Sequence, residues 1–296
     1  RDSSTSRGLG DVYKRQLLGK AMEATNRITP PTVLIISATD SGGCAGMQAD
    51  LRVCASLRVF AVCAVTAVTA QNSLGVKEVL PMPGELVRQQ IQCAVEQQKP
   101  QAVKIGLLPD VSVMRSVFET LSELGVSDII FDPVMAATAG KLIEDDRQKW
   151  IDTLLGYLSN ITLLTPNLPE LEMLGRKSLE KPEEIDNAVK QLRRLYGAKG
   201  VLVKGGHGIA ANKCVDKLFS AGRNDVLTLT SEEIHTCNLR GTGCSLSTAI
   251  ACYMALGCGL EEAEEKAHKY LQKAILSGKR YCYDAGSGPV DHFVNL

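Results

Sequence analysis

Short apolar runs and longer segments of helical periodicity alternate along most of the chain. The apolar runs are typical of parallel strands that are covered on both faces. Strands are expected at residues 33–38, 60–70, 76–82 (a possible projecting flap), 102–105, 128–131, 161–164, 200–203, 213–220 and 226–232. Helices are expected at residues 48–57, 84–98, 111–124, 146–158 and 182–196, and two further long helices follow residue 241.

This alternation predicts an α/β fold with a doubly wound, mostly parallel sheet and helices on both faces. The chain has 296 residues, 45% of them hydrophobic, which would suffice for one large domain or two smaller ones. The regular alternation favours a single domain, expected from residue 22 to residue 296. Residues 1–21 are polar and lack periodicity, so we interpret them as a disordered or non-native leader.

Composition and charge exclude several classes of partner. Lys and Arg together number 33, as do Asp and Glu, so no net charge attracts the chain to nucleic acid or to a membrane surface. The longest apolar stretch, residues 59–70, is shorter than the ~20 residues of a membrane-spanning helix. Ten cysteines occur without a C-x-x-C pair, which is typical of reduced thiols in a cytoplasmic protein rather than of disulfides or a zinc site.

The sequence Gly241-Thr242-Gly243-Cys244-Ser245 lies between a polar strand-like segment and an apolar helical run. Glycines allow a tight turn and a close approach of the backbone to a ligand. The first N–H groups of the following helix would then face the loop, which is a favourable place for a phosphate. We expect Cys244 to lie at the positive end of this helix, with its pKa lowered, although packing alone could also explain a small residue there.

Polar or glycine-rich groups follow five of the expected strands. They are Asp40 with Gly42, Gly43 and Gly46; Gln71; Asp132; Asn167 with Glu170; and Lys204 with Gly205 and Gly206. In a doubly wound sheet these strand ends share one edge, so the groups should converge. Two acids, a lysine and a helix N-terminus are the parts that phosphoryl transfer requires. The sequence therefore indicates a kinase.

Seven short motifs, in order, resemble those of the hydroxymethylpyrimidine/phosphomethylpyrimidine kinase family. The motifs are A-T-D-S-G-G-C-A-G-M-Q-A-D-L (38–51), A-V-T-A-Q-N (67–72), K-I-G-L-L (104–108), T-P-N-L-P-E (165–170), V-K-G-G-H (203–207), R-G-T-G-C-S-L-S (240–247) and G-P-V-D-H-F (288–293). They span the chain from about residue 33 to its end. The resemblance implies a ribokinase-like three-layer αβα fold and a role in thiamine biosynthesis.

The resemblance also implies ATP- and Mg²⁺-dependent phosphorylation of an amino-substituted hydroxymethylpyrimidine and then of its monophosphate. A homodimer that acts on a small molecule in the cytoplasm, without nucleic acid or membrane, would be expected. The closest rival is a pyridoxal kinase, which shares the fold and many motifs. A catalytically silent nucleotide- or vitamin-binding regulator is a rival of another class, which the intact motifs disfavour.

By similarity, individual residues receive roles. The expected catalytic group comprises Cys244 as the candidate base, Gly241, Gly243 and Lys204. The pyrimidine would be held by Gln71 and Asp50 in a pocket lined by Ala38, Leu107 and Val134. ATP would contact Lys204, Thr242, Gly243 and Arg240, and Mg²⁺ would be bound by Asn167, Glu170 and Asp132.

Some of these roles have ordinary structural alternatives. Asp50 and Glu170 could simply stabilise helix N-termini, and Asp132 could cap a turn before Pro133. An amide such as that of Gln71 offers a donor and an acceptor together, which matches a ring nitrogen beside an amine. Three departures from the family pattern stand out: Cys44 replaces a glycine, Arg240 replaces a histidine, and Ala285 lies where relatives often have a basic residue. A side chain at position 44 would restrict the loop if a positive φ is required there.

Overall fold

The computed structural model describes residues 29–135, 146–205, 213–223, 225–283 and 286–294. Pro31–Leu296 forms one compact unit, separate from Arg1–Pro30. The expected leader, residues 1–21, and Ala285 lie outside the described residues. No described helix has the length and hydropathy of a membrane-spanning segment.

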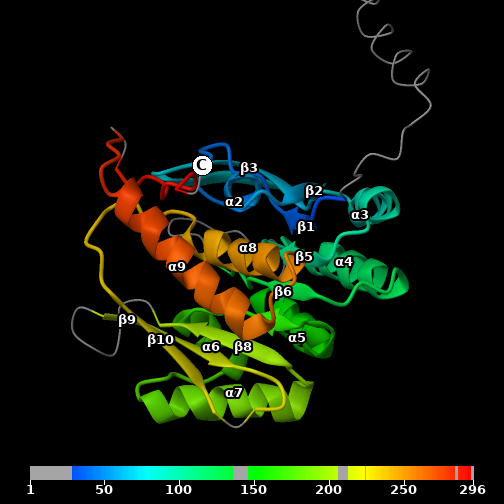
Figure 1. Cartoon of the computed structure of the whole chain (residues 1–296). Helices are drawn as coiled ribbons and strands as arrows, with labels where there is room; N and C mark the ends of the chain where they lie inside the picture. The colour runs from blue at the N-terminus through cyan, green and yellow to red at the C-terminus, as the bar shows by residue number, and fades with distance from the viewer. Residues whose placement is uncertain (1–28, 136–145, 206–212, 224, 284–285, 295–296) are drawn as a thin grey trace, which may run out of the picture. The chain divides into compact units, whose positions relative to one another are not determined.

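An eight-stranded sheet forms the centre of the unit Pro31–Leu296, in the order β10-β9-β8-β7-β6-β5-β1-β2 (Figure 1). The strands are β1 (Thr32–Ser37), β2 (Phe60–Val65), β5 (Ala102–Ile105), β6 (Ile129–Phe131), β7 (Leu163–Leu164), β8 (Gly200–Lys204), β9 (Lys213–Phe219) and β10 (Leu227–Glu232). The neighbours from β8 to β2 pair in parallel, whereas β9 and β10 are antiparallel.

Helices cover both faces of this sheet. They are α2 (Gly46–Ser56), α3 (Gly84–Gln98), α4 (Val111–Glu123), α5 (Arg147–Tyr157), α6 (Leu168–Gly175), α7 (Pro182–Tyr196), α8 (Thr242–Ala255) and α9 (Leu260–Gly278), with a short 3₁₀ turn η1 (Leu158–Asn160). Alternate residues of β1 point to opposite faces. Val33 and Ile35 pack in a core with α2, α8 and α9, whereas Leu34 and Ile36 pack in a second core with α3 to α7. The predicted three-layer αβα fold is confirmed.

The apolar run 60–70 was expected as one strand, but it divides at Thr66. There the Thr66 hydroxyl donates to the Leu107 carbonyl at 2.7 Å, and its N–H donates to Ser37 O at 3.1 Å. The chain then leaves the main sheet as β3 (Ala67–Asn72), which pairs with β4 (Gly75–Pro81) in a separate two-stranded antiparallel ribbon. A bulge between Ala70 and Gln71 alters the direction of the end of β3. This ribbon brings Gln71 to the carboxyl ends of the parallel strands.

Candidate active site

A cavity of about 240 Å³ lies where the carboxyl ends of the parallel strands meet the N-terminus of α8. Its wall includes most residues that the sequence analysis selected: Ala38, Gln71, Leu107, Asp132, Val134, Asn167, Glu170, Lys204, Arg240, Gly241, Thr242, Gly243 and Cys244. Asp50 is not one of the described residues that line it. Sequence-distant strand ends therefore converge as the topology required.

The N-terminus of α8 forms one side of the cavity. Gly241 precedes the helix with φ of 80°, and a Cβ atom built there would lie 2.0 Å from the Cys44 carbonyl oxygen. Only glycine fits this combination of left-handed backbone and close approach. A Cβ at Gly243 would lie 3.3 Å from both Asp132 Oδ2 and Lys204 Nζ. The first turn of α8 thus presents its N–H groups beside a charged pair, as an anion site requires.

The charged pair is formed by Lys204, at the end of β8, and Asp132, after β6. Lys204 Nζ lies 2.6 Å from Asp132 Oδ1, and the Thr165 hydroxyl donates to the same oxygen at 3.3 Å. Burial disfavours the charge on Lys204, but the carboxylates of Asp132 and Glu170 outweigh it and raise the pKa of its ammonium. Lys204 therefore stays protonated at neutral pH and supplies a fixed positive charge beside the helix N-terminus.

Asn167 and Glu170 begin α6 and form a capping box. The Asn167 Oδ1 atom accepts a hydrogen bond from Glu170 N, and Glu170 Oε2 accepts one from Asn167 N, both at 2.8 Å. Burial, reinforced by Asp132 and opposed by Lys204, raises the pKa of Glu170 to about 7. The helix-capping alternative is therefore real, yet both side chains also line the cavity, so their metal role stays a prediction.

The glycine-rich loop after β1 is organised by the buried carboxylate of Asp40. Its oxygens accept hydrogen bonds from the N–H groups of Gly42, Cys44 and Ala45 at 2.8–2.9 Å. Gly43 and Gly46 adopt positive φ values, but Cys44 does not. The side chain of Cys44 therefore does not restrict the backbone of the loop through a positive φ.

Arg240 joins this loop to the β3–β4 ribbon. Its Nη1 atom donates to the Asn72 carbonyl at 2.7 Å, and its Nη2 atom lies 4.0 Å from Asp40 Oδ2. The guanidinium thus adds permanent positive charge to the cavity wall.

The expectation of a lowered pKa at Cys244 is wrong. Burial raises the pKa of its thiol to about 11, and the carboxylates of Asp50 and Asp132 act in the same direction. The Lys104 ammonium and a backbone N–H at Gly46 lower the pKa, but by less than burial raises it. The resting side chain is consequently a neutral thiol at pH 7.

Apolar side chains and the amide of Gln71 form another part of the wall. Ala38 and Leu107 form a small buried cluster with Ala67, against which Val134 packs. Ser41 holds the backbone of Gln71, donating to its carbonyl at 2.7 Å and accepting from its N–H at 2.9 Å. No described residue forms a hydrogen bond with the Gln71 side chain, which leaves the amide available to a ligand.

Asp50 lies deeper, beyond the first turn of α2, which contains no acidic residue, so the alternative role of stabilising the helix N-terminus does not apply. Its Oδ2 atom is 2.8 Å from Lys104 Nζ, and its Oδ1 atom accepts a hydrogen bond from the Thr248 hydroxyl at 2.7 Å. Both Asp50 and Lys104 are 0% exposed. Lys104 received no role from the sequence alone, although a charged residue inside the apolar strand β5 is the signal that could have identified it.

Comparisons with known sequences agree with this geometry. A model of the phosphomethylpyrimidine kinase family matches residues 40–291. The hydroxymethylpyrimidine/phosphomethylpyrimidine kinase of Bacillus subtilis is 36% identical, over 88% of this chain and 94% of its own length. A probable thiamine biosynthetic bifunctional enzyme of Oryza sativa is 33% identical over 94% of this chain. The chain spans only 50% of that enzyme's length.

Solved structures show the same fold. The structure of a Bacillus subtilis pyridoxal kinase in complex with ADP has a TM-score of 0.79 and 28% identity, and the match covers 88% of this chain and 97% of that one. A phosphomethylpyrimidine kinase from Clostridium difficile has a TM-score of 0.70 and 29% identity, with coverage of 82% and 99%.

Proposed function

The chain belongs to the phosphomethylpyrimidine kinase family, and we propose that it phosphorylates hydroxymethylpyrimidine and then the resulting monophosphate. In each step the γ-phosphoryl group of ATP moves to an acceptor oxygen. The bond from the γ-phosphorus to the bridging oxygen breaks, and ADP leaves. The acceptor of the first step is the hydroxymethyl oxygen, which loses its proton, and the acceptor of the second is a phosphate oxygen.

The observation that carries this proposal is that two chemically different groups of residues line one cavity. One group combines the N-terminus of α8 with Lys204, which suits the phosphates of ATP. The other combines the apolar wall of Ala38 and Leu107 with the amide of Gln71, which suits a flat heterocycle bearing an amine. A phosphoryl group and an acceptor would meet between them.

The side chains around the transferred group have complementary roles in this proposal. Lys204 and the first-turn N–H groups of α8 stabilise charge on the phosphoryl oxygens. Cys244 stands beside them as the candidate acceptor of the hydroxyl proton. A neutral thiol cannot accept a proton, so Cys244 would act as the base only through its thiolate form, which its raised pKa makes a minor species at pH 7. Phosphoryl transfer depends mostly on positioning and electrostatics, so the hydroxyl proton can leave late.

Mg²⁺ fits the acidic side of the cavity. Asp132 and Glu170 bring two carboxyl groups to the wall beside Lys204, and Asn167 adds an amide oxygen. Carboxylate and amide oxygens suit this hard cation, which usually retains several waters. Bound there, Mg²⁺ would neutralise charge on the nucleotide phosphates.

Pyridoxal is a second candidate acceptor, favoured by the TM-score of 0.79 to a pyridoxal kinase. Its ring is also flat, with a hydroxymethyl group, and could occupy the same apolar wall. We propose the pyrimidine as the preferred acceptor, because the relative from Bacillus subtilis at 36% identity is a hydroxymethylpyrimidine/phosphomethylpyrimidine kinase. We also propose a homodimer in the cytoplasm, on the resemblance and the free state of the described cysteines.

The decisive experiment measures ADP release by the purified chain with ATP and Mg²⁺. Four conditions are compared: hydroxymethylpyrimidine, its monophosphate, pyridoxal and no acceptor. Turnover of both pyrimidines well above that of pyridoxal is expected, and a preference for pyridoxal would overturn the proposed acceptor.

We expect Gln71→Ala to raise KM for the pyrimidine at least tenfold, in line with the loss of two hydrogen bonds. KM for ATP should rise much less. Equal effects on both would remove Gln71 from the acceptor site.

A further inference from the structure

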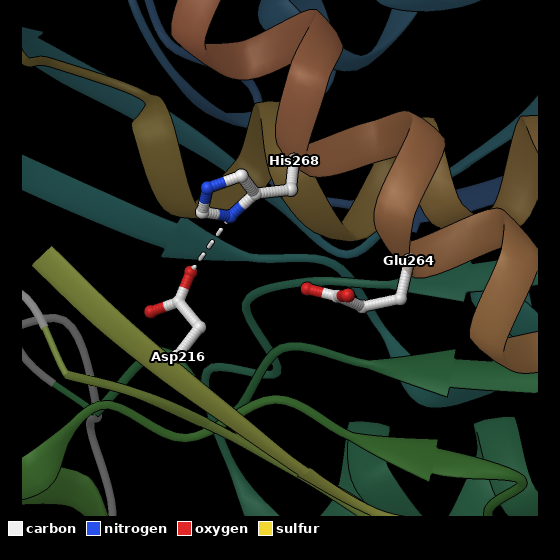
Figure 2. Close-up of side chains that lie close together, drawn as sticks. All are labelled: Asp216, Glu264 and His268. Carbon is white, nitrogen blue, oxygen red and sulfur yellow. Dashed lines mark ion pairs between the residues drawn. The ribbon is translucent and has the colours of Figure 1, made fainter. Parts of the chain in front are cut away.

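Away from the cavity, three ionisable side chains converge between β9 and α9. Asp216 comes from β9, and Glu264 and His268 lie one turn apart on α9 (Figure 2). Their candidate ligand atoms all lie within 4.8 Å of one another. None of the three is among the described residues that line the active-site cavity.

The carboxylate of Glu264 has no hydrogen-bond partner within the described part of the chain. Glu264 is 0% exposed, and both of its oxygens are buried and unpaired. Figure 2 shows this carboxylate directed toward the space beside the imidazole and the Asp216 carboxylate. The Nε2 atom of His268 is likewise buried without a partner among the described residues. Leaving a buried carboxylate unpaired is costly, so a group that fills this space would relieve a real penalty.

The contact between His268 and Asp216 is also unusual. Their Nδ1 and Oδ2 atoms lie 3.4 Å apart, longer than a charge-assisted hydrogen bond of about 2.8 Å. Two ligands bound tetrahedrally with bonds of about 2.0–2.1 Å are separated by about 3.3–3.4 Å. The other oxygen of Asp216 accepts a hydrogen bond from Gly205 N at 3.0 Å, which orients the carboxylate. The pair therefore has the spacing of two ligands on one ion.

We propose that Asp216, Glu264 and His268 bind a divalent transition-metal cation of the Zn²⁺ type. An imidazole with two carboxylates favours Zn²⁺, Co²⁺ or Mn²⁺ over Mg²⁺, because imidazole nitrogen is a poor ligand for hard cations. Rotation of the Glu264 side chain would bring its oxygen to bonding distance, and water would complete the coordination. The ion would join the antiparallel edge of the sheet to α9.

The first experiment adds Co²⁺ or Zn²⁺ to the chelator-treated, reduced full-length chain. One ion per chain is expected, with a rise in Tm. The visible spectrum of bound Co²⁺ should indicate nitrogen and oxygen ligands without a thiolate charge-transfer band, which distinguishes this site from the ten cysteines. No binding at millimolar metal, or a spectrum dominated by thiolate ligation, would overturn the proposal.

Variants then locate the ion. Glu264→Gln and His268→Gln should each lose at least about tenfold in Zn²⁺ affinity, measured by competition with a chromophoric chelator. Glu262→Gln is the matched control, because Glu262 pairs with Lys266 on the exposed side of the same helix and should retain wild-type affinity. Wild-type affinity in a folded Glu264→Gln variant would exclude the site. If both ligand variants fail to fold, the Co²⁺ spectrum of the wild-type chain decides the question alone.

Discussion

Burial dominates the chemistry of Cys244. Its place in the first turn of α8 would lower the thiol pKa if the side chain were exposed, yet the surroundings raise the pKa to about 11. Sequence reasoning could locate this residue at a helix N-terminus. It could not supply the degree of burial or the nearby carboxylates of Asp50 and Asp132, because these come from distant segments of the chain.

We predict that Cys244→Ala binds ATP but turns over about 10²–10⁴-fold more slowly, if Cys244 accepts the hydroxyl proton. ADP release and nucleotide binding measured on the same preparation separate the two effects. Cys252→Ala is the control, because Cys252 is buried in the same helix against Cys54 and should alter stability rather than turnover. Near-normal turnover of Cys244→Ala would leave that thiol with a packing role only.

His292 should make stability depend on pH. Burial, assisted by the positive charge of Arg52, lowers the pKa of this imidazole to about 4, whereas an unfolded histidine titrates near ~6.5. Between these values the unfolded state binds more protons, so the free energy of unfolding falls as the pH drops from ~6.5 to ~4. The loss attributable to His292 should approach about 3 kcal/mol.

Denaturant unfolding at pH 7 and pH 5 tests this dependence. The variant His292→Gln should lose less stability between the two pH values than the wild type does. His235→Gln serves as the control, since the His235 side chain is 74% exposed and its replacement should leave the dependence unchanged. Identical pH profiles for wild type and His292→Gln would contradict the assignment.

At the scale of elements, the N-terminus of α8 is fixed by contact with the loop after β1. Gly241→Ala would place a Cβ 2.0 Å from the Cys44 carbonyl and force a positive φ on alanine. We predict that the first turn of α8 shifts, so that kcat/KM for ATP falls at least tenfold, since small displacements of positioning groups are costly. Steady-state kinetics at varied ATP gives the measurement.

Gly257→Ala is the control that measures backbone strain alone, without the steric clash expected at position 241. Gly257 follows the other end of α8 with φ of 92°, and a Cβ there meets nothing within 4 Å. Only the strain should remain, at about 1 kcal/mol of stability with unchanged turnover. If Gly241→Ala behaves like Gly257→Ala, the contact with Cys44 does not position the first turn of α8.

Local pattern was enough to predict most elements, because strands such as β5 and helices such as α7 carry their own periodicity. Local pattern failed where a contact with a residue distant in the sequence determines the structure. The break at Thr66 depends on the Leu107 carbonyl from another strand end, and the run 60–70 contains no turn residue that would reveal it. The strand-end residues of the site were predictable since parallel topology gathers them, whereas the burial of Asp50 was not.

At the scale of the whole compact unit, one buried network joins three elements. Asp50 from α2, Lys104 from β5 and Thr248 from α8 meet where the central sheet contacts the helices of one face. Each is 0% exposed, so neither charge has access to water. Removing one partner of a buried pair leaves the other charge uncompensated, which costs far more than the pair itself contributes.

We therefore predict that Asp50→Asn and Lys104→Met each lower the free energy of unfolding by about 3–5 kcal/mol, and that the double variant recovers part of this loss. Thr248→Val, which removes one hydrogen bond, should cost only about 1 kcal/mol. Denaturant unfolding gives these values, and kinetics decides the role of Asp50.

By sequence, Asp50 is expected to hold the pyrimidine. If it acts only through this network, folded Asp50→Asn should raise KM for the pyrimidine much less than Gln71→Ala does. A comparable rise in KM with little loss of stability would instead assign Asp50 to the acceptor site.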